Sequence, residues 1–346
     1  MAAFLFVFIV ILIFVFYNFH YKRKGLPPGP IPLPFFGNSL TLMRHPPGED
    51  IFLEWRQRFG PIFTFWLGET PVICIAEYNK IVEYYQRGGE AFAGRHAIEA
   101  YERIIRGGIY GVLQTEGEIW REHRRFVLHV FRDFGVGKNI MQERILTEIS
   151  EMFKLLDLEI NEQQKLNEIE IDIVKHLERA ISSIINVLLV GFRFDEEAIL
   201  FDLWISGQET TTTALSWGIA LLLHNPSVME KVQEELDNKF GNEQELVSWS
   251  DRSSLPYTCA VVNEILRVGN VVAQDFPHRM MKDTKVDKWL LRKGQPIVAQ
   301  ISVVLVDPNI SPGDSFPSLK REIGIPVLCP KFTCRVIKRW KKTIQI

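Results

Sequence analysis

The feature that most constrains this chain is the apolar run at its start. Residues Ala2 to Tyr17 carry no polar or charged side chain before the final tyrosine, and six of the 24 Phe residues lie within the first twenty positions. About 16 to 20 apolar residues are at the lower limit for crossing a hydrocarbon core of about 30 Å. The sequence therefore predicts a transmembrane anchor over residues 1–21.

A cleaved signal peptide is the alternative interpretation of this run. It would need basic residues before the apolar stretch and a small-residue cleavage site after it. Here the basic residues, Lys22 to Lys24, follow the stretch. Positive charge behind a span favours retention of that side in the cytosol, so an uncleaved anchor with a cytosolic body is favoured. The cysteines would then be free thiols in a reducing compartment.

The segment after the anchor is a basic, proline-rich linker over residues 22–49. Five prolines fall within the eight positions from Pro27 to Pro34, a density that excludes a helix or a central strand. The segment is predicted to be a stiff, extended spacer. It could be a plain linker, a ligand for a proline-binding module, or a rigid arm that fixes the body against the bilayer.

Charge and cysteine content exclude several classes of protein. The 346 residues include 40 Lys+Arg and 42 Asp+Glu, which is too balanced for a disordered tail or a basic nucleic-acid binder. The four cysteines, Cys74, Cys259, Cys329 and Cys334, are too scattered for a disulfide framework or a paired metal site. The length fits one large domain or about two ordinary ones.

From about Asp50 the sequence is typical of a mainly α body with a small β component. Apolar periodicity predicts helices over residues 51–59, 79–86, 117–131, 140–158, 169–189, 200–224, 227–240 and 257–268. A β-hairpin is predicted over residues 61–76, and short strands return over residues 282–300.

The first local motif is the pair Trp120 and Arg124, which helical spacing places on one face. An indole N–H beside a guanidinium suits an anionic group such as a carboxylate. An ordinary exposed, charged helix is the alternative.

The second motif is the stretch Ser206 to Thr213, which interrupts a long apolar helix with a glycine and four threonines. Threonine hydroxyls can bond to carbonyls one turn earlier and bend the axis. The adjacent Glu209 and Thr210 would form a proton-handling acid–alcohol pair at such a kink. A tolerated polar seam is the alternative.

The third motif joins Glu264 and Arg267, three residues apart on the helix from Tyr257. An exposed pair of this kind contributes about 0–1 kcal/mol. Loss of one partner from a buried pair costs about 3–5 kcal/mol.

Together the anchor, the proline arm and the three motifs resemble the heme-thiolate monooxygenases, the cytochrome P-450 family. The stretches Arg132–Asn139 and Asp251–Tyr257 are similar to animal microsomal, nematode-like members. The resemblance runs from Met1 to about Asp307 and implies a mainly α cytochrome P-450-like fold with a small β component, incomplete here, behind an N-terminal transmembrane anchor.

The resemblance also implies roles for single residues. Trp120, Arg124 and His278 match contacts to the heme propionates, and Gly207 matches the position that leaves room for dioxygen. Glu209 and Thr210 match the catalytic pair that relays protons to iron-bound oxygen. The family's structural pair on the proximal side, which is not catalytic, is matched by Glu264 and Arg267.

Two departures from the family pattern stand out. The stretch Gly191–Asp195 resembles a point well before the oxygen-binding helix, yet Asp202 to Trp204 follow almost at once, so several helices of the substrate pocket are absent. The family's axial loop, Phe-x-x-Gly-x-Arg-x-Cys-x-Gly, is matched nowhere in the chain. Cys329 and Cys334 both fail its spacing, and an ordinary free cysteine is the expected role of each.

The resulting domain layout has four parts. They are an anchor (residues 1–21), a linker (22–49), a cytochrome P-450-like domain with an internal deletion near 195–202 (50–310), and a divergent tail (311–346). By resemblance the protein binds heme b and inserts one oxygen atom of O2 into a small apolar substrate. Its electrons come from NADPH through a flavoprotein reductase at the endoplasmic reticulum membrane. The alternative is a catalytically inactive, membrane-anchored remnant, splice form or incomplete gene model. No nucleic acid is expected as a partner.

Overall fold

The computed structural model describes residues 2–46, 48–133, 139–164, 171–190, 197–241 and 246–306. These residues form two compact units. The first unit, here called the sheet unit, takes the described residues up to 109, residues 114–118 and those from 272 onward. The second, here called the helical unit, takes residues 110–113 and the described residues of 119–271.

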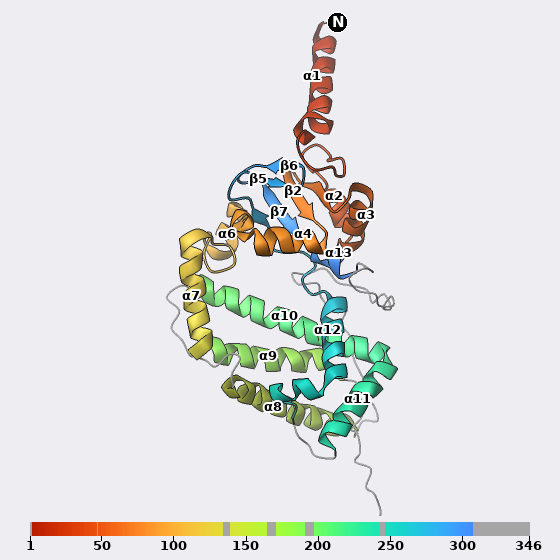
Figure 1. The fold of residues 1–346 in the computed structure, drawn as a ribbon, viewed down its shortest axis with the longest axis vertical. Helices are drawn as coiled ribbons and strands as arrows, with labels where there is room; N and C mark the ends of the chain where they lie inside the picture. The colour runs from red at the N-terminus through yellow and green to blue at the C-terminus, as the bar shows by residue number, and fades with distance from the viewer. Residues whose placement is uncertain are drawn as a thin grey trace, which may run out of the picture. The chain divides into compact units, whose positions relative to one another are not determined.

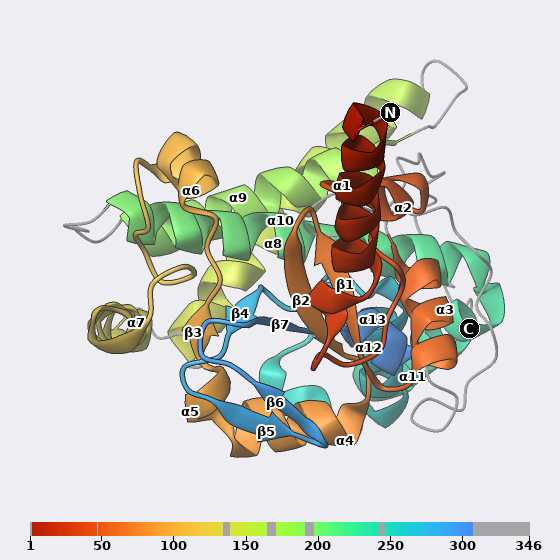
Figure 2. The same cartoon turned by 90° about the horizontal axis from the view of Figure 1, so that it is seen from above.

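A five-stranded mixed sheet forms the centre of the sheet unit (Figure 2). Its strands, in the order in which they neighbour one another, are β1 (Ile62–Leu67), β2 (Thr70–Ile75), β7 (Pro296–Ala299), β4 (His278–Arg279) and β3 (Gly94–Arg95). β2 and β7 pair in parallel, and the other neighbours pair antiparallel. A separate hairpin joins β5 (Thr284–Val286) to β6 (Trp289–Leu291).

The sheet is buried on both faces, which explains why β1 is apolar almost throughout. Phe63 and Phe65 pack on Trp55 of α3 (Glu49–Phe59) on one face. Ile73 packs on the other face, in a cluster that includes Phe92. A strand covered on both sides has no solvent face to supply alternating polar residues.

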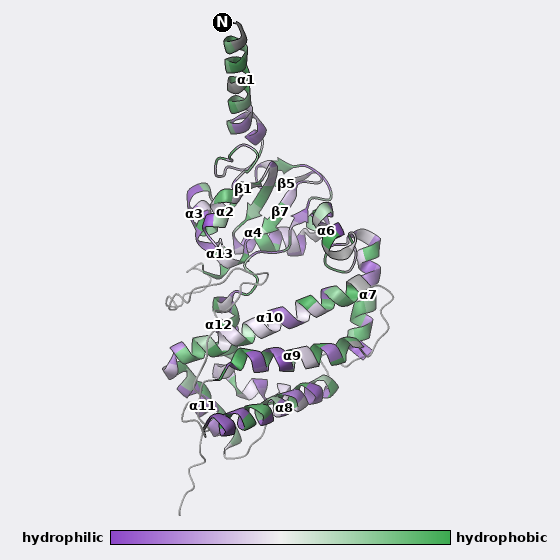
Figure 3. Cartoon of the chain, turned by 180° about the vertical axis from the view of Figure 1, so that it is seen from behind, coloured by the Kyte–Doolittle hydropathy of each residue, from purple (hydrophilic) through white to green (hydrophobic). Residues whose placement is uncertain are grey.

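The remaining helices of the sheet unit are short, apart from the first. They are α1 (Ala2–Phe19), α2 (Ser39–Arg44), α4 (Tyr78–Ile81), α5 (Gly89–Phe92), α6 (Glu99–Arg106) and α13 (Ile301–Leu305), with the 3-10 turn η1 (Tyr21–Arg23) and the π-helical segment η2 (Val82–Arg87). α1 is long and apolar enough to cross a membrane and exposes nearly all of its surface (Figure 3).

The proline-rich segment lies against the sheet as an extended strand-like arm. Thr64 of β1 donates its backbone N–H to Pro28 O at 2.9 Å and its hydroxyl to Pro27 O at 2.9 Å. Gly29 approaches the Thr64 backbone so closely that a Cβ there would lie 1.8 Å from the Thr64 oxygen. The arm is therefore docked on the body along this part of its length.

The helical unit consists of long helices around a small apolar core (Figure 1). They are α7 (Gly117–Asp133), α8 (Asn139–Gln164), α9 (Ile173–Val190), α10 (Glu197–His224), α11 (Pro226–Phe240) and α12 (Pro256–Gly269), with the 3-10 segment η3 (Trp249–Ser254). α9 packs against both α8 and α10, and α12 packs against α10 and α11. Leu156 and Ile160 of α8 meet Ile173 of α9 in the core.

The predicted elements are found with shifts of a few residues at their ends. Two details differ from the prediction. The predicted helix over residues 79–86 is divided into α4 and the π-helical η2, and the helix expected from residue 169 begins at Ile173. The short elements α2, α5, α6, α13, β3 and β4 carry too few residues to give a periodic signal.

Candidate functional site

The Ser206–Thr213 stretch lies inside α10, which continues as one α-helix from Glu197 to His224. Thr210 donates its hydroxyl proton to the Ser206 carbonyl, and Ser206 donates to the Asp202 carbonyl at 2.6 Å. These are the predicted back-bonds, and they use the hydroxyl donors within the helix. Glu209 is exposed and Thr210 is half-buried, so the carboxylate is open to solvent while the alcohol is held against the helix.

Gly207 faces α9 in the helical unit. A Cβ at this position would lie 2.8 Å from Ile185 Cδ1. The close approach of α9 to α10 is therefore one physical reason for a glycine here. Its role in leaving room for dioxygen stays a prediction.

Trp120 and Arg124 meet on α7, as their spacing predicts. The Arg124 guanidinium lies 5.3 Å from the centroid of the Trp120 ring. Arg124 is exposed, and no carboxylate among the described residues pairs with it. Val127 and Val130 bury the opposite side of the helix. The indole and the guanidinium thus remain available as donors to an anionic group.

His278 lies in the sheet unit, where β4 places it directly opposite Arg95 of β3. This pairing joins two basic side chains that are 183 residues apart in the sequence. Arg95 Nη1 donates to His278 Nε2 at 2.9 Å, which assigns the proton of the neutral imidazole to Nδ1. The ring of Tyr85 meets the imidazole edge-on, with centroids 5.2 Å apart, and restricts its orientation.

Arg95 and His278 form a half-buried basic pair, with the Asp275 carboxylate beside the imidazole. Among the described residues the Arg95 side chain bonds to the imidazole and forms no ion pair. Burial lowers the pKa of Arg95, and the negative charge of Asp275 opposes that shift. His278 Nδ1 is buried 3.1 Å from Asp275 Oδ2, without the alignment of a hydrogen bond. Such a pair favours an anionic ligand such as a carboxylate.

Glu116 holds this basic pair from the side. It accepts the Arg95 backbone N–H at 2.9 Å and forms an ion pair with Arg279, whose Nε lies 3.1 Å from Glu116 Oε2. The carboxylate thereby links the strand that carries Arg95 to the strand that carries His278. Sequence reasoning identified His278 but missed Arg95 and Glu116, because no local spacing connects residues so far apart.

Asp202 is a second carboxylate that sequence reasoning did not identify as functional. It lies on α10 with only 2% of its surface exposed. Its Oδ2 accepts the backbone N–H of Val112 at 2.7 Å and of Leu113 at 2.9 Å. The side chain therefore fixes the loop segment of the helical unit that precedes α7.

Glu264 and Arg267 form the predicted pair on α12. Arg267 donates from Nε at 2.7 Å and from Nη2 at 2.6 Å to the two carboxylate oxygens. These hydrogen bonds lower the pKa of Glu264 and raise that of Arg267. Both side chains are half-buried, so the pair lies between the exposed and buried cases that the sequence left open.

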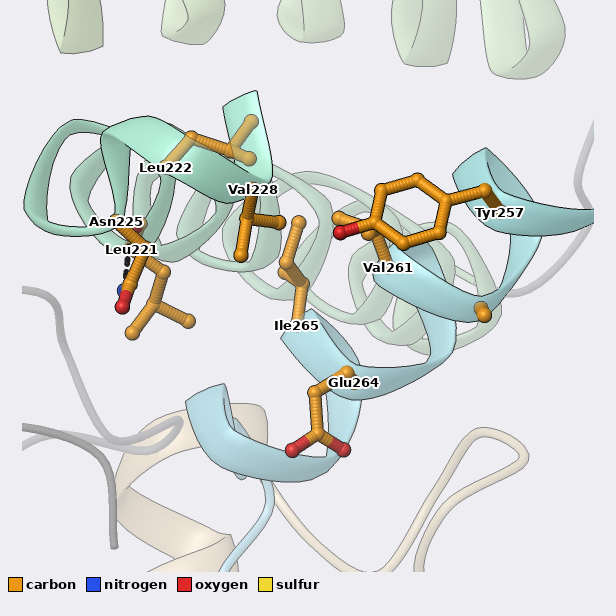
Figure 4. Close-up of a pocket in the computed structure, with 9 residues that line it drawn as sticks. Leu221, Leu222, Asn225, Val228, Tyr257, Val261, Glu264 and Ile265 are labelled. Atoms are coloured by element: carbon orange, nitrogen blue, oxygen red, sulfur yellow. Dashed lines mark hydrogen bonds between the residues drawn. The ribbon is translucent and has the colours of Figure 1, made fainter. Parts of the chain in front are cut away.

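Beside Glu264 the helical unit has an apolar cavity of about 240 Å³ between α10, α11 and α12. Figure 4 shows Val228, Val261 and Ile265 pointing toward one another in its wall, with the ring of Tyr257 at one side. The lining offers few polar groups, so the cavity is suited to apolar side chains or ligands.

Comparison with known proteins identifies the protein family to which this chain belongs. A family model described as cytochrome P-450 matches residues 27–198 and 196–312. The two stretches meet at the place where the sequence predicts an internal deletion. They cover more than half of the chain.

Individual proteins similar to this chain are also cytochromes P-450. The chain is 26% identical over 392 residues to cytochrome P-450 2G1 of Oryctolagus cuniculus, covering 84% of this chain and 77% of the relative. It is 28% identical to cytochrome P-450 2B4 of the same species, covering 86% and 81%. For cytochrome P-450 2C8 of Homo sapiens the identity is 26%, covering 83% and 76%.

The alignment length confirms the internal shortening. Because 84% of 346 residues is about 291, about 100 of the 392 positions aligned with the first relative have no residue from this chain. The animal microsomal character of the resemblance is also confirmed, since these relatives are animal cytochromes P-450. The nematode-like character stays a prediction.

The described residues fit the carboxylate groups of a heme better than they fit its iron, for which they offer no suitable cysteine ligand. Arg95 and His278 offer a basic pair, and the buried His278 Nδ1, 3.1 Å from Asp275 Oδ2, has no aligned hydrogen bond within the described part of the chain. Cys74 is wholly buried in β2, and burial raises the pKa of its thiol well above the usual value. Cys259 donates its thiol to Arg252 O at 3.5 Å on α12. Neither is suited to ligate iron, and Cys329 and Cys334 lie outside the described residues.

Proposed function

Because the chain belongs to the cytochrome P-450 family, we propose that it is a membrane-anchored heme-thiolate monooxygenase. It inserts one oxygen atom of O2 into a small apolar substrate and receives electrons from NADPH through a flavoprotein reductase. α1 anchors it in the endoplasmic reticulum membrane, with the body facing the cytosol, because the basic residues 22–24 follow the apolar span.

The observation that carries this proposal is the pairing of Arg95 with His278. The Arg95 guanidinium is half-buried and bonds to the imidazole, and burial lowers its pKa although the charge of Asp275 opposes that shift, so a further anion beside it would stabilise its charged form. The propionate groups of heme b are anions of the right kind. Arg95 would bind one by charge-assisted hydrogen bonds, with His278 Nδ1 as a neighbouring donor.

The remaining residues keep the roles that the family pattern gives them. In the helical unit Trp120 Nε1 and the Arg124 guanidinium would be donors to a propionate. The heme, when bound, supplies the oxygen-activating chemistry. Glu209 holds and releases a proton at its exposed carboxylate, and Thr210 Oγ1 passes it on after leaving its bond to the Ser206 carbonyl. Glu264 and Arg267 keep a structural role.

A second candidate is a membrane protein of this family that lacks monooxygenase activity. The absence of the Phe-x-x-Gly-x-Arg-x-Cys-x-Gly pattern from the chain favours it. A thiolate ligand pushes electron density toward O–O cleavage. Heme held without a thiolate, or no heme at all, would leave the anchor and the helical body without that chemistry.

The absorption spectrum of the reduced, carbon-monoxide-bound full chain separates the two candidates. A thiolate-type Soret band is the result expected for the monooxygenase, and the single replacements Cys329→Ser and Cys334→Ser would then identify the ligand. A band of the non-thiolate type, or no bound heme, would establish the second candidate.

A variant at Arg95 tests heme binding without requiring turnover. Arg95→Met is expected to reduce the heme content of the purified chain, measured as the pyridine hemochromogen, because it removes the buried guanidinium. Arg292→Met is the matched control, since Arg292 pairs with Asp283 at the exposed β5–β6 hairpin. Equal heme content in the two variants would exclude Arg95 as a heme ligand.

A further inference from the structure

The phenol hydroxyl of Tyr85 is buried, and no hydrogen-bond partner for it lies among the residues that the structure describes. The neighbouring Tyr84 differs, because its hydroxyl donates to Asp287 Oδ1 at 2.8 Å and accepts the Asp287 N–H at 3.2 Å. A buried phenol normally has a partner, since a hydroxyl that leaves water without gaining a hydrogen bond costs free energy. The Tyr85 hydroxyl therefore lacks an acceptor within the described part of the chain.

The two tyrosines of the π-helical segment η2 face different partners. Both rings lie against Phe92, with centroids 5.4 Å apart for Tyr84 and 5.8 Å for Tyr85. The Tyr84 hydroxyl reaches the turn of the β5–β6 hairpin, whereas the Tyr85 ring meets the His278 imidazole of β4 edge-on at 5.2 Å. Short π-helical turns occur frequently at functional sites. In this chain the turn brings a phenol to the basic pair of Arg95 and His278.

The charges around the Tyr85 phenol determine that it is a donor. Burial raises the pKa of Tyr85 well above its usual value, and Asp275 adds to that shift while Arg95 opposes it. The phenol therefore stays protonated at neutral pH. Asp275 offers a carboxylate here, with its Oδ2 at 3.1 Å from His278 Nδ1. Within the described residues neither the phenol nor this ring nitrogen forms an aligned hydrogen bond to it.

We propose that Tyr85 is a further cofactor-binding residue, whose phenol donates a hydrogen bond to the heme carboxylate that Arg95 binds. The inference rests on the proposed function, because the acceptor is a propionate group of the heme. A carboxylate has about four lone-pair sites, so it can accept from a guanidinium and a phenol together. The added bond would satisfy the buried hydroxyl and oppose heme release. A bond from Tyr85 to Asp275 is the competing arrangement, and it would not involve the heme.

The test uses the full chain purified with heme in detergent micelles. Tyr85→Phe removes the hydroxyl and keeps the ring contacts with Phe92 and His278. Tyr84→Phe is the matched control, because it removes the adjacent hydroxyl, which bonds to Asp287 at the hairpin. Two quantities are measured, namely the rate at which heme passes to excess apomyoglobin and the propionate bending band in the resonance Raman spectrum.

Tyr85→Phe is expected to release heme about ten times faster than the wild-type chain, as for the loss of one hydrogen bond to a charged group, and to shift the propionate band. Tyr84→Phe is expected to change the release rate by less than about twofold and to leave the band in place.

Three outcomes would overturn the inference. Unchanged release and an unchanged band in Tyr85→Phe, with heme bound to the wild-type chain, would leave the proposed function intact. Faster release without a shift of the band would assign a structural role to Tyr85, such as a bond to Asp275. A wild-type chain that takes up no added hemin would refute the proposed function and this inference with it.

Discussion

The polar clusters of the two units are built from partners at very different distances in the sequence. In the sheet unit, His278 bonds to a residue 183 positions away, and Arg279 to one 163 positions away. In the helical unit, Thr210 and Arg267 bond to residues four and three positions away. The sheet unit therefore depends on strand pairing to assemble its cluster, whereas the Thr210 and Arg267 motifs each form within a single helix.

Asp202 in the helical unit departs from this local pattern, because its carboxylate bonds to backbone groups about 90 residues away, and Gln142 likewise accepts the backbone N–H of Trp249, 107 positions away. A local helical motif can survive partial unfolding of its surroundings, whereas a bond between distant segments reports on the whole packing. Replacing a residue that bonds two distant segments is therefore expected to lower the unfolding free energy more than replacing a residue of a local helical motif.

The largest effect is predicted for Asp202→Ala. The change leaves two half-buried backbone N–H groups without the Asp202 acceptor, at an expected cost of about 3 kcal/mol of unfolding free energy. Urea denaturation in detergent micelles measures the cost, and hydrogen–deuterium exchange at Val112 and Leu113 localises it. Asp202→Asn keeps one acceptor oxygen and is expected to lose about half as much. Unchanged exchange at both amides in Asp202→Ala would show that the loop is held by other contacts.

The next largest effect is predicted for Arg279→Met in the sheet unit. Glu116 would remain half-buried, and the Arg95 N–H would be its remaining donor among the residues that the structure describes, at an expected cost of about 2 kcal/mol. The same denaturation experiment measures it. Arg292→Met removes an arginine that is 72% exposed, and a change below about 0.5 kcal/mol is expected. Equal losses of unfolding free energy in Arg279→Met and Arg292→Met would show that the Arg279–Glu116 pair contributes no more than an exposed pair.

The same contrast explains what the sequence could predict. The long helices, the hairpin over residues 61–76 and the pair Glu264–Arg267 follow from periodicity and from spacings of three or four residues. Trp120 and Arg124 meet for the same reason. Arg95 and Glu116 could not be found, because their contact with the β4 strand is created by the pairing of β3 with β4.

The second motif shows a different limit of sequence reasoning. The glycine and threonines of α10 predicted hydroxyl back-bonds, and the bonds of Ser206 and Thr210 are present. Yet α10 continues through them without a break, because packing on α9 and α12 stabilises it beyond its intrinsic propensity. Propensity alone does not decide whether a weak stretch interrupts a helix.

A smaller effect is predicted for Glu264→Gln at neutral pH. The pair is bidentate but half-exposed, so the loss of charge is expected to cost about 1 kcal/mol. Glu99→Gln is the matched control, because Glu99 and Arg103 form an exposed pair one helical turn apart. That control is expected to change stability by less than about 0.3 kcal/mol. A cost of about 3–5 kcal/mol for Glu264→Gln would instead show the pair to be fully buried in solution.

The smallest effect is the pH dependence of that difference. The hydrogen bonds from Arg267 lower the pKa of Glu264 in the folded protein below its ordinary value of 4.5. The stability that this carboxylate contributes is therefore complete above pH 4.5 and is lost as the pH falls through the lower, folded value. Below that value the wild-type side chain is protonated and nearly isosteric with glutamine. Denaturation curves of wild type and Glu264→Gln should accordingly converge as the pH is lowered below 4.5, and a gap that stays constant would mean that the pair does not depend on the charge of Glu264.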